Sequence, residues 1–180
     1  MMSYKLRNSI TAIIVALTIN TIAQKNNQFP ALLGHTLEGP SISLPEKAAK
    51  KYTIIGICFK RTAESALKTW INPMYETFVA KADESNYADV ANYFDVNYYF
   101  IPLISGFKKA ANDFKANTQK DLWKNIIDCD TDIKLLKEQL KPSDDDAPYF
   151  FVVDLKGKIV EVVSGKFTEA KMDKLQDAID

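Results

Sequence analysis

The chain has 180 residues, of which 47% are hydrophobic and 26% are charged. These proportions are those of an ordinary soluble globular protein, and the length suits one domain with a substantial core. Because 23 basic residues balance 23 acidic ones, the formal net charge gives no basis for binding nucleic acid or an anionic membrane surface.

The N-terminal stretch has the three-part layout of a secretory signal peptide (residues 1–23). Two basic residues precede an apolar run over residues 10–19, and Thr21 and Ala23 are the small residues that signal peptidase reads. The apolar run is roughly half as long as a membrane-spanning helix, and an uncleaved N-terminal anchor is the alternative. Cleavage before Gln24 would leave 21 basic and 23 acidic residues in the remaining domain. We predict an exported protein, periplasmic or envelope-associated in a bacterium, that touches a membrane only through an uncleaved anchor.

The remaining residues, 24–180, are expected to form a single domain. After Gln24 the chain begins extended, and Gly34, Gly39 and Pro40 are turn signals. Residues 53–59 form a nearly continuous apolar run rich in β-branched side chains. Such a run predicts a central strand that is covered on both faces.

A long helix is predicted to follow a short polar turn. From Ala66 to residue 82 the apolar residues recur at helical spacing. Pro73 interrupts this pattern and should kink the helix, because its ring clashes with the preceding turn.

The middle of the chain predicts a second strand over residues 95–104 and a helix over residues 106–117. Residues 119–141 have a mostly helical pattern, although residues 125–130 could instead form a short strand.

The C-terminal part predicts a polar loop at residues 142–148 and a hairpin formed by residues 149–154 and 159–164. Thr168 is the expected N-cap of a last helix, which would bury Met172, Leu175 and Ile179. Strand–helix alternation followed by a hairpin and a helix predicts an α/β fold with a mixed sheet and helices on both faces.

The two cysteines invite the question of a disulfide, since exported proteins often form one. Cys58 lies inside the apolar run and is expected to be a buried, inert thiol, whereas the exposure of Cys129 is left open. Neither lies at a helix N-terminus beside positive charge, so the sequence does not favour a reactive thiolate. Their pairing also stays open, because the sequence does not give the distance between their α-carbons.

The order of elements resembles the thioredoxin-like superfamily. Residues 29–45 resemble the extended opening of peroxiredoxin and TlpA-type proteins, and residues 53–59 resemble the strand that delivers the active site. Residues 147–165 are similar to the closing hairpin, in which a proline, often cis, faces the redox site. The resemblance covers about residues 29–180 and implies a three-layer α/β/α fold with a mixed central sheet, a C-terminal β-hairpin and a helix.

The resemblance fails at the turn where the catalytic cysteines would lie. Thr62 and Ser65 have the spacing of a Cys-x-x-Cys pair; alternatively, Ser65 stands where a peroxiredoxin has its peroxidatic cysteine. A serine hydroxyl is scarcely ionised near neutral pH, whereas a cysteine in such a turn is largely thiolate. We therefore expect no catalytic residue here. The remaining turn and the loop opposite it are predicted to hold an extended peptide, through Lys60, Arg61, Thr62, Ser65, Ala147 and Pro148.

A cysteine-free family offers a second resemblance, to mitochondrial assembly factors for the membrane sector of ATP synthase with a degenerate thioredoxin-like fold. The similarity comprises a Trp-x-x-Pro at residues 70–73 and a Val-Asp-x-x-Gly-Lys-Ile hairpin at residues 153–159. Gly165 and a Thr-Glu helix start at residues 168–169 follow. The resemblance implies a binding or assembly role and no specific client.

Other chemistries lack the necessary residues. His35, the one histidine, is expected to be a surface turn residue, and with two separated cysteines it leaves a zinc site short of ligands. Residues 128–132 begin like a calcium loop, but Ile133 and Gln139 stand where that loop needs glycine and glutamate. No Gly-x-Ser-x-Gly elbow surrounds Ser65, and there is no glycine-rich phosphate loop. We expect neither a metal nor a cofactor.

Aromatic residues crowd one fifteen-residue window of the chain. Packing of a helix on the sheet is the favoured explanation, and a sticky patch for a protein partner is the alternative. The window comprises Tyr87, Tyr93, Phe94, Tyr98, Tyr99 and Phe100.

Two hypotheses about function follow. The first is an exported thioredoxin-like module with a degenerate, redox-inactive site that binds an unidentified protein or peptide. The second is a thiol-disulfide oxidoreductase or peroxiredoxin-like protein that uses the relocated cysteines Cys58 and Cys129.

Overall fold

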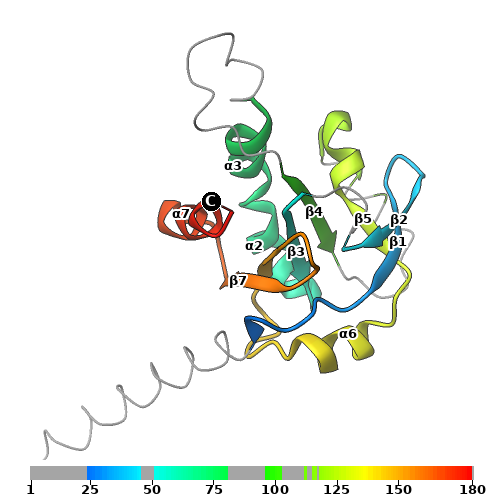
Figure 1. Cartoon of the computed structure of the whole chain (residues 1–180). Helices are drawn as coiled ribbons and strands as arrows, with labels where there is room; N and C mark the ends of the chain where they lie inside the picture. Colours follow the sequence, from blue (N-terminus) through cyan, green and yellow to red (C-terminus); the bar gives the residue numbers. More distant parts are fainter. Residues whose placement is uncertain are drawn as a thin grey trace, which may run out of the picture.

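Figure 1 shows the arrangement of the chain in a computed structural model. The structure describes residues 24–45, 51–80, 96–102, 112, 115, 116 and 118–179. The predicted signal peptide and most of the helix predicted over residues 106–117 lie outside these residues.

A four-stranded mixed sheet forms the centre of the fold. Its strands lie in the order β4 (Asn97–Pro102), β3 (Thr53–Cys58), β6 (Tyr149–Val153) and β7 (Ile159–Ser164). β3 runs parallel to β4 and antiparallel to β6, which pairs in turn with β7 as the predicted hairpin. Every residue of β3 is buried, as expected for a central strand covered on both faces.

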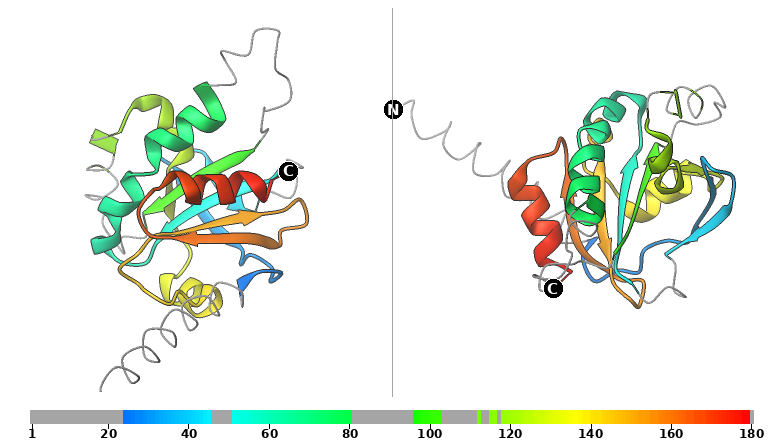
Figure 2. Two further views of the ribbon diagram at one scale, coloured as in Figure 1. Left: turned by 90° about the vertical axis from the view of Figure 1, so that its left-hand side faces the viewer. Right: turned by 90° about the horizontal axis from the view of Figure 1, so that it is seen from above.

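Two apolar cores cover the two faces of this sheet. Ile54 and Cys58 belong to one cluster, which we call the α7-side core, and Ile55 and Ile57 belong to the other, the α6-side core. This alternation follows from the two-residue period of a strand. Figure 2 shows α2, α3 and α7 on one side of the sheet and α6 on the other, which confirms the predicted mixed sheet with helices on both faces.

The long helix predicted after the turn is divided into segments. A 3₁₀ turn, η2 (Arg61–Ala63), leads into α2 (Glu64–Lys68); α3 (Ile71–Tyr75) follows and continues as a π-helical turn, η3 (Glu76–Ala80). Pro73 causes the break at Thr69 and Trp70. It has no N–H to donate to the Thr69 carbonyl, and its ring clashes with that carbonyl. The predicted interruption is confirmed and lies one turn before the proline.

A second sheet of three antiparallel strands contains β2 (Ser41–Leu44), β1 (Leu32–Thr36) and β5 (Ile127–Cys129), in that order. Gly39, with φ +120°, and Pro40 form the predicted turn between β1 and β2. The prediction of a turn at Gly34 is wrong, because this residue lies inside β1. A Cβ on Gly34 would stand 2.4 Å from the Asp128 carbonyl oxygen, so glycine is needed there for the close approach of β5.

The stretch over residues 119–141 is less helical than its pattern indicates. It contains a 3₁₀ helix, η5 (Lys120–Asn125), then β5, then α6 (Ile133–Leu140). The short strand considered as an alternative for residues 125–130 is therefore present as β5. The acids of residues 128–132 form a junction into α6, where the Asp132 carboxylate accepts a hydrogen bond of 2.8 Å from the Lys134 N–H.

The last helix, α7 (Glu169–Asp177), begins after Thr168 as predicted, although the Thr168 side chain makes no capping hydrogen bond. Met172 and Leu175 are buried in the α7-side core, and Ile179 packs against it. Of the aromatic window, Tyr98 and Phe100 lie in the same core, which confirms core packing for these two residues. Tyr87, Tyr93 and Phe94 lie outside the described residues.

Candidate functional site

The turn after β3 lies on the surface, where the predicted site residues are exposed. β3 is the second strand from the sheet edge and carries the chain to the end of the sheet at Cys58. Lys60, Arg61, Thr62 and Ser65 are exposed there, whereas Ala63 points into the α7-side core. Chain segments that follow the carboxyl ends of parallel strands are where open α/β sheets generally bind ligands.

The loop before β6 lies against this turn. Because Ile57 pairs with Tyr149 in antiparallel register, residues that precede Tyr149 lie beside residues that follow Ile57. The Phe59 and Tyr149 rings meet edge to face, with centroids 6.2 Å apart. The structure therefore brings together the two segments that the sequence assigned to one surface.

Two carboxylates that the sequence reasoning missed connect these segments. The Thr62 hydroxyl donates a hydrogen bond to the Asp146 carboxylate, and Lys60 Nζ lies 3.3 Å from Asp146 and 3.8 Å from Asp145. Lys137 of α6 pairs with Asp145. The available signal was the run of three aspartates directly before Ala147-Pro148, which we interpreted only as a polar loop. We call Lys60, Thr62, Lys137, Asp145 and Asp146 the turn–loop cluster.

The charges of this cluster are mutually compensated. The hydrogen bond from Thr62, followed by the hydrogen bond from Lys60, lowers the pKa of Asp146 below its ordinary value. Both bonds stabilise the ionised carboxylate. A threonine hydroxyl that donates a hydrogen bond to a carboxylate can position a loop. It does not provide the thiolate nucleophile that disulfide exchange needs.

The other predicted site residues have different surroundings. Arg61 and Ser65 are exposed and do not belong to the turn–loop cluster. Ala147 is half-buried and Pro148 is buried; the Pro148 carbonyl accepts a hydrogen bond of 2.9 Å from the Gly165 N–H. The often-cis geometry of the superfamily is absent here, since within the described ranges the cis peptide bond is Leu44–Pro45.

Both cysteines are free and lie in different cores. Cys58 belongs to the α7-side core, whereas Cys129 packs against the α6-side core on the other face of the sheet. Burial, with a smaller effect of the Glu64 carboxylate, raises the pKa of Cys58 to about 12. Burial also raises the pKa of Cys129, against the opposing effect of hydrogen bonds with Thr131. A raised pKa disfavours the thiolate that redox chemistry requires.

His35 is a surface residue as expected, although it lies on β1 and not in a turn. Its Nδ1 is 2.9 Å from Asp130, and its side chain is 52% exposed. The part of the chain that the structure describes contains no group of three or more His, Cys, Asp or Glu side chains that could hold a metal ion. Over the same residues, no helix is long and apolar enough to cross a membrane.

The residues of the Trp-x-x-Pro resemblance have a structural role in this fold. Trp70 is fully buried and stacks on Phe150 with centroids 4.2 Å apart, and Phe167 meets it edge to face at 5.3 Å. Trp70 Nε1 donates a hydrogen bond of 3.0 Å to the Gly165 carbonyl. The Thr69 hydroxyl accepts a bond of 3.0 Å from the Phe167 N–H. These contacts join the end of the hairpin to the break between α2 and α3.

Solved structures of similar fold include several thiol-disulfide proteins. The thioredoxin domain of a thiol-disulfide oxidoreductase from Bacteroides vulgatus is 18% identical, with a TM-score of 0.54, and the match covers 87% of this chain and 98% of that chain. A putative thiol:disulfide interchange protein DsbE from Chlorobium tepidum is 16% identical, with a TM-score of 0.58 and the same coverage. BsSco, a member of the Sco family of cytochrome c oxidase assembly proteins, is 13% identical, with a TM-score of 0.58, and the match covers 85% of this chain and 92% of that chain. These likenesses establish the thioredoxin-like fold.

A family model extends the comparison to the sequence. The model described as ATP10 protein matches residues 7–180, which include the Trp-x-x-Pro and the hairpin that resemble the cysteine-free assembly factors. No match to a curated protein was found. With a thioredoxin-like fold, two free cysteines and no Cys-x-x-Cys, the chain belongs to the ATP10 family.

Proposed function

We propose that this protein is a binding or assembly module in which the thioredoxin-like fold holds a partner and carries out no redox reaction. The observation that supports this function best is the turn–loop cluster, in which Thr62 occupies a position where the superfamily has sulfur and bonds to Asp146. The family membership favours an assembly role, and the partner is a protein or an extended peptide.

The two thiols support this proposal over the relocated-cysteine alternative. Cys58 and Cys129 lie on opposite faces of the four-stranded sheet, and both have a raised pKa. A dithiol that cycles with its disulfide needs α-carbons within about 7 Å and at least one accessible thiolate. Cys58 does not offer the accessible thiolate, because it is fully buried in the α7-side core.

The proposed binding surface is the exposed face of the turn–loop cluster together with Arg61, Ser65 and Ala147. Lys60 and Asp146 are about half exposed, so they are available to a partner. The cluster presents both signs of charge, which favours electrostatic selection of a partner with the opposite arrangement. We also propose that the protein is exported and acts in the cell envelope, because its N-terminal residues have the layout of a secretory signal.

Site-specific photo-crosslinking in the native envelope tests the binding function. A photoreactive residue in place of Arg61 should crosslink a reproducible partner, and the crosslink should weaken when Lys60→Glu is added. Lys156→Glu is the matched control, because Lys156 is an exposed lysine in the β6–β7 turn, at the opposite end of the sheet. Equal crosslinking in the two variants would contradict a partner that reads the turn–loop cluster.

Two further assays test the absence of redox chemistry and the export. The purified protein should reduce insulin no faster than the uncatalysed reaction, and turnover that disappears in Cys58→Ser would favour the oxidoreductase alternative. N-terminal sequencing of the protein from the envelope should begin at Gln24 if the signal is cleaved. A cytoplasmic product beginning at Met1 would contradict export.

A further inference from the structure

The cations of the turn–loop cluster are paired to different degrees. Lys137 pairs closely with Asp145, whose side chain is only 19% exposed, so this carboxylate is largely shielded from a partner. Lys60 lies 3.3 Å from Asp146 and 3.8 Å from Asp145. Both distances exceed the length of about 2.7–2.9 Å that is typical of a strong charge-assisted hydrogen bond. Because Lys60 is also about half exposed, it keeps hydrogen-bonding capacity for a partner.

Arg61 is the cation of the proposed binding surface that the fold leaves unpaired. It is exposed, and no hydrogen bond or ion pair joins its side chain to any residue that the structure describes. It is also the one arginine after the predicted signal peptide, since the other arginine of the chain is Arg7. A guanidinium presents a rigid fork of N–H donors that fits a carboxylate through two parallel hydrogen bonds, whereas a lysine acts as a point charge. The residue best suited to this recognition therefore stands beside Lys60 with its donors free.

Ser65 adds a second free donor close to Arg61. The turn η2 leads directly into α2, and residues four positions apart on a helical segment are neighbours on one face. Ser65 is exposed, and its hydroxyl bonds to none of the described residues. The hydrogen bond from Thr62 to Asp146 holds the backbone between the two side chains against the loop. Arg61 and Ser65 are therefore presented from a fixed position.

The surroundings of Arg61 favour a carboxylate over a more highly charged anion. Asp144 and Asp146 are exposed in the loop beside the turn, and the bonds from Thr62 and Lys60 stabilise the ionised form of Asp146. A phosphate group carries about 1.5 to 2 negative charges near neutral pH. The two aspartates repel it more strongly than they repel the single charge of a carboxylate.

We propose that the partner held at the turn–loop cluster presents the carboxylate of an aspartate or glutamate to Arg61. The guanidinium binds this carboxylate through two parallel hydrogen bonds, Ser65 donates to one of its oxygens, and Lys60 adds a positive charge on the loop side. This assignment rests on the proposed function, because it names the chemical group by which a protein or peptide partner is recognised at the same surface.

A titration of the full chain, followed by NMR, tests the contact. The probe is the peptide N-acetyl-Ala-Glu-Ala-amide, and N-acetyl-Ala-Gln-Ala-amide is its uncharged isostere. The Glu peptide should shift the side-chain Nε–H of Arg61 and the backbone amide of Ser65 saturably. The Gln peptide should bind about two- to fivefold more weakly, the effect of one solvent-accessible ion pair. Equal binding of the two peptides, or no shift at Arg61 with the Glu peptide, would overturn the proposal.

Substitutions of Arg61 separate the effect of the fork from the effect of its charge. In Arg61→Gln the two peptides should bind equally, which completes a double-mutant cycle for the ion pair. Arg61→Lys keeps the charge but loses the two parallel donors, so its preference for the Glu peptide should lie between those of the wild type and Arg61→Gln. An undiminished preference in Arg61→Gln would overturn the ion pair, and one in Arg61→Lys would overturn the bidentate contact.

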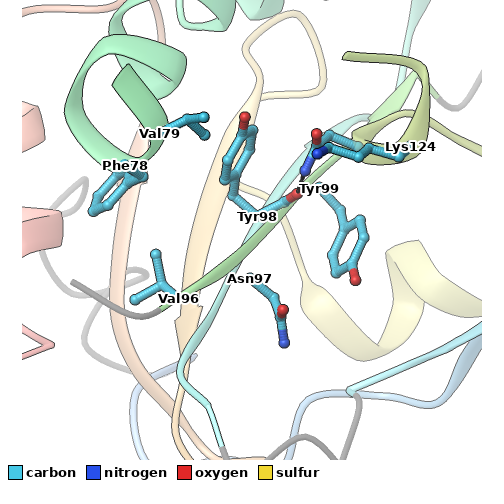
Figure 3. A pocket seen from close by; sticks show the side chains of 8 residues that line it. Phe78, Val79, Val96, Asn97, Tyr98, Tyr99 and Lys124 are labelled. Atoms are coloured by element: carbon cyan, nitrogen blue, oxygen red, sulfur yellow. Dashed lines mark hydrogen bonds between the residues drawn. The ribbon is translucent and has the colours of Figure 1, made fainter. Parts of the chain in front are cut away.

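Lys124→Gln is the matched control, because Lys124 is an exposed cation away from the turn–loop cluster. It lines a pocket of about 290 Å³ together with Tyr98 of β4 (Figure 3). Tyr98 pairs with Ile54 near the start of β3, whereas Lys60 follows the other end of this strand. The control should prefer the Glu peptide as strongly as the wild type does. Loss of the preference in Lys124→Gln would overturn the proposal, since the carboxylate would then bind at the pocket and not at Arg61.

A second probe and the crosslinking assay separate the remaining outcomes. Inorganic phosphate should bind more weakly than the Glu peptide, and phosphate binding of equal strength would overturn the choice of a carboxylate. Failure of this contact can be told apart from failure of the proposed function. Crosslinking from position 61 reports whether a protein binds the surface, whereas the titration reports which group is recognised there. A reproducible crosslinked partner together with equal binding of the two peptides would refute the carboxylate contact and leave the proposed function standing.

Discussion

The contact between Trp70 and the end of the hairpin should provide a large share of the stability of this fold. Trp70→Phe keeps a ring that can stack on Phe150, but it removes the hydrogen bond to the Gly165 carbonyl. This bond is partly buried, and the loss of a hydrogen bond of this kind costs about 0.5–1.5 kcal/mol. The smaller ring adds about 1–2 kcal/mol for lost contacts and a residual cavity, because Trp70 is fully buried. We expect the free energy of unfolding to fall by about 1.5–3.5 kcal/mol, out of a typical total of about 5–15 kcal/mol.

Urea denaturation followed by far-ultraviolet circular dichroism measures this change without depending on tryptophan fluorescence. Trp123→Phe is the control, because Trp123 is half-buried and its Nε1 donates a longer bond, 3.3 Å, to the Thr118 carbonyl. The control should lose less than about 1 kcal/mol. A Trp70→Phe variant within about 0.5 kcal/mol of the wild type would refute the structural role assigned to the Trp-x-x-Pro residues.

Three further predictions follow from the pKa shifts and the close contacts. The pKa of Cys58 is raised from 9.0 to about 12, so this thiol ionises at a lower pH in the unfolded chain than in the folded one. The free energy of unfolding should therefore fall between these pH values by up to about 1.4 kcal/mol per pH unit. Urea denaturation should show a smaller fall over this pH range for Cys58→Ala than for the wild type. Thr62→Val should raise the pKa of Asp146 toward 3.8 in a carboxyl NMR titration, because it removes the hydrogen bond that lowers this pKa most. The stabilisation that comes with the lowered pKa is present above 3.8 and is lost as the pH falls through the folded-state value. Gly34→Ala, which would bring a Cβ within 2.4 Å of the Asp128 carbonyl oxygen, should cost about 1–3 kcal/mol and increase hydrogen exchange in β5.

Periodicity in the sequence predicted the elements whose burial follows from local patterns. The apolar run over residues 53–59, the hairpin and the last helix are all present, since each buries a face that its own residues define. Gly34 was misinterpreted because its requirement comes from β5, more than ninety residues later in the chain. The sequence does not decide between strand and helix for β5, since a three-residue strand is too short to show a period.

The turn–loop cluster could be predicted only in part for a similar reason. The resemblance indicated that the turn and the Ala147-Pro148 loop share one surface, and the structure places them side by side. The roles of Asp145 and Asp146 depend on the register of β6 against β3, which fixes the aspartates that reach Lys60 and Thr62. The register depends on how two strands pair, so it cannot be read from the composition of the loop before β6.

The fold and the proposed binding surface of this protein depend on different residues. Trp70 is fully buried and bonds to the half-buried Gly165, which fixes the first helix against the hairpin, so changing Trp70 alters the architecture. Thr62 lies on the surface, where a hydroxyl can replace a thiol without disturbing any core contact. Structures of thiol-disulfide proteins can therefore match this chain at 16–18% identity, and such matches show a common fold without a common function. The proposed binding surface needs only that the turn and the loop be held together. The hydrogen bond from Thr62 to Asp146 and the ion pair between Lys60 and Asp146 hold them together without a cysteine.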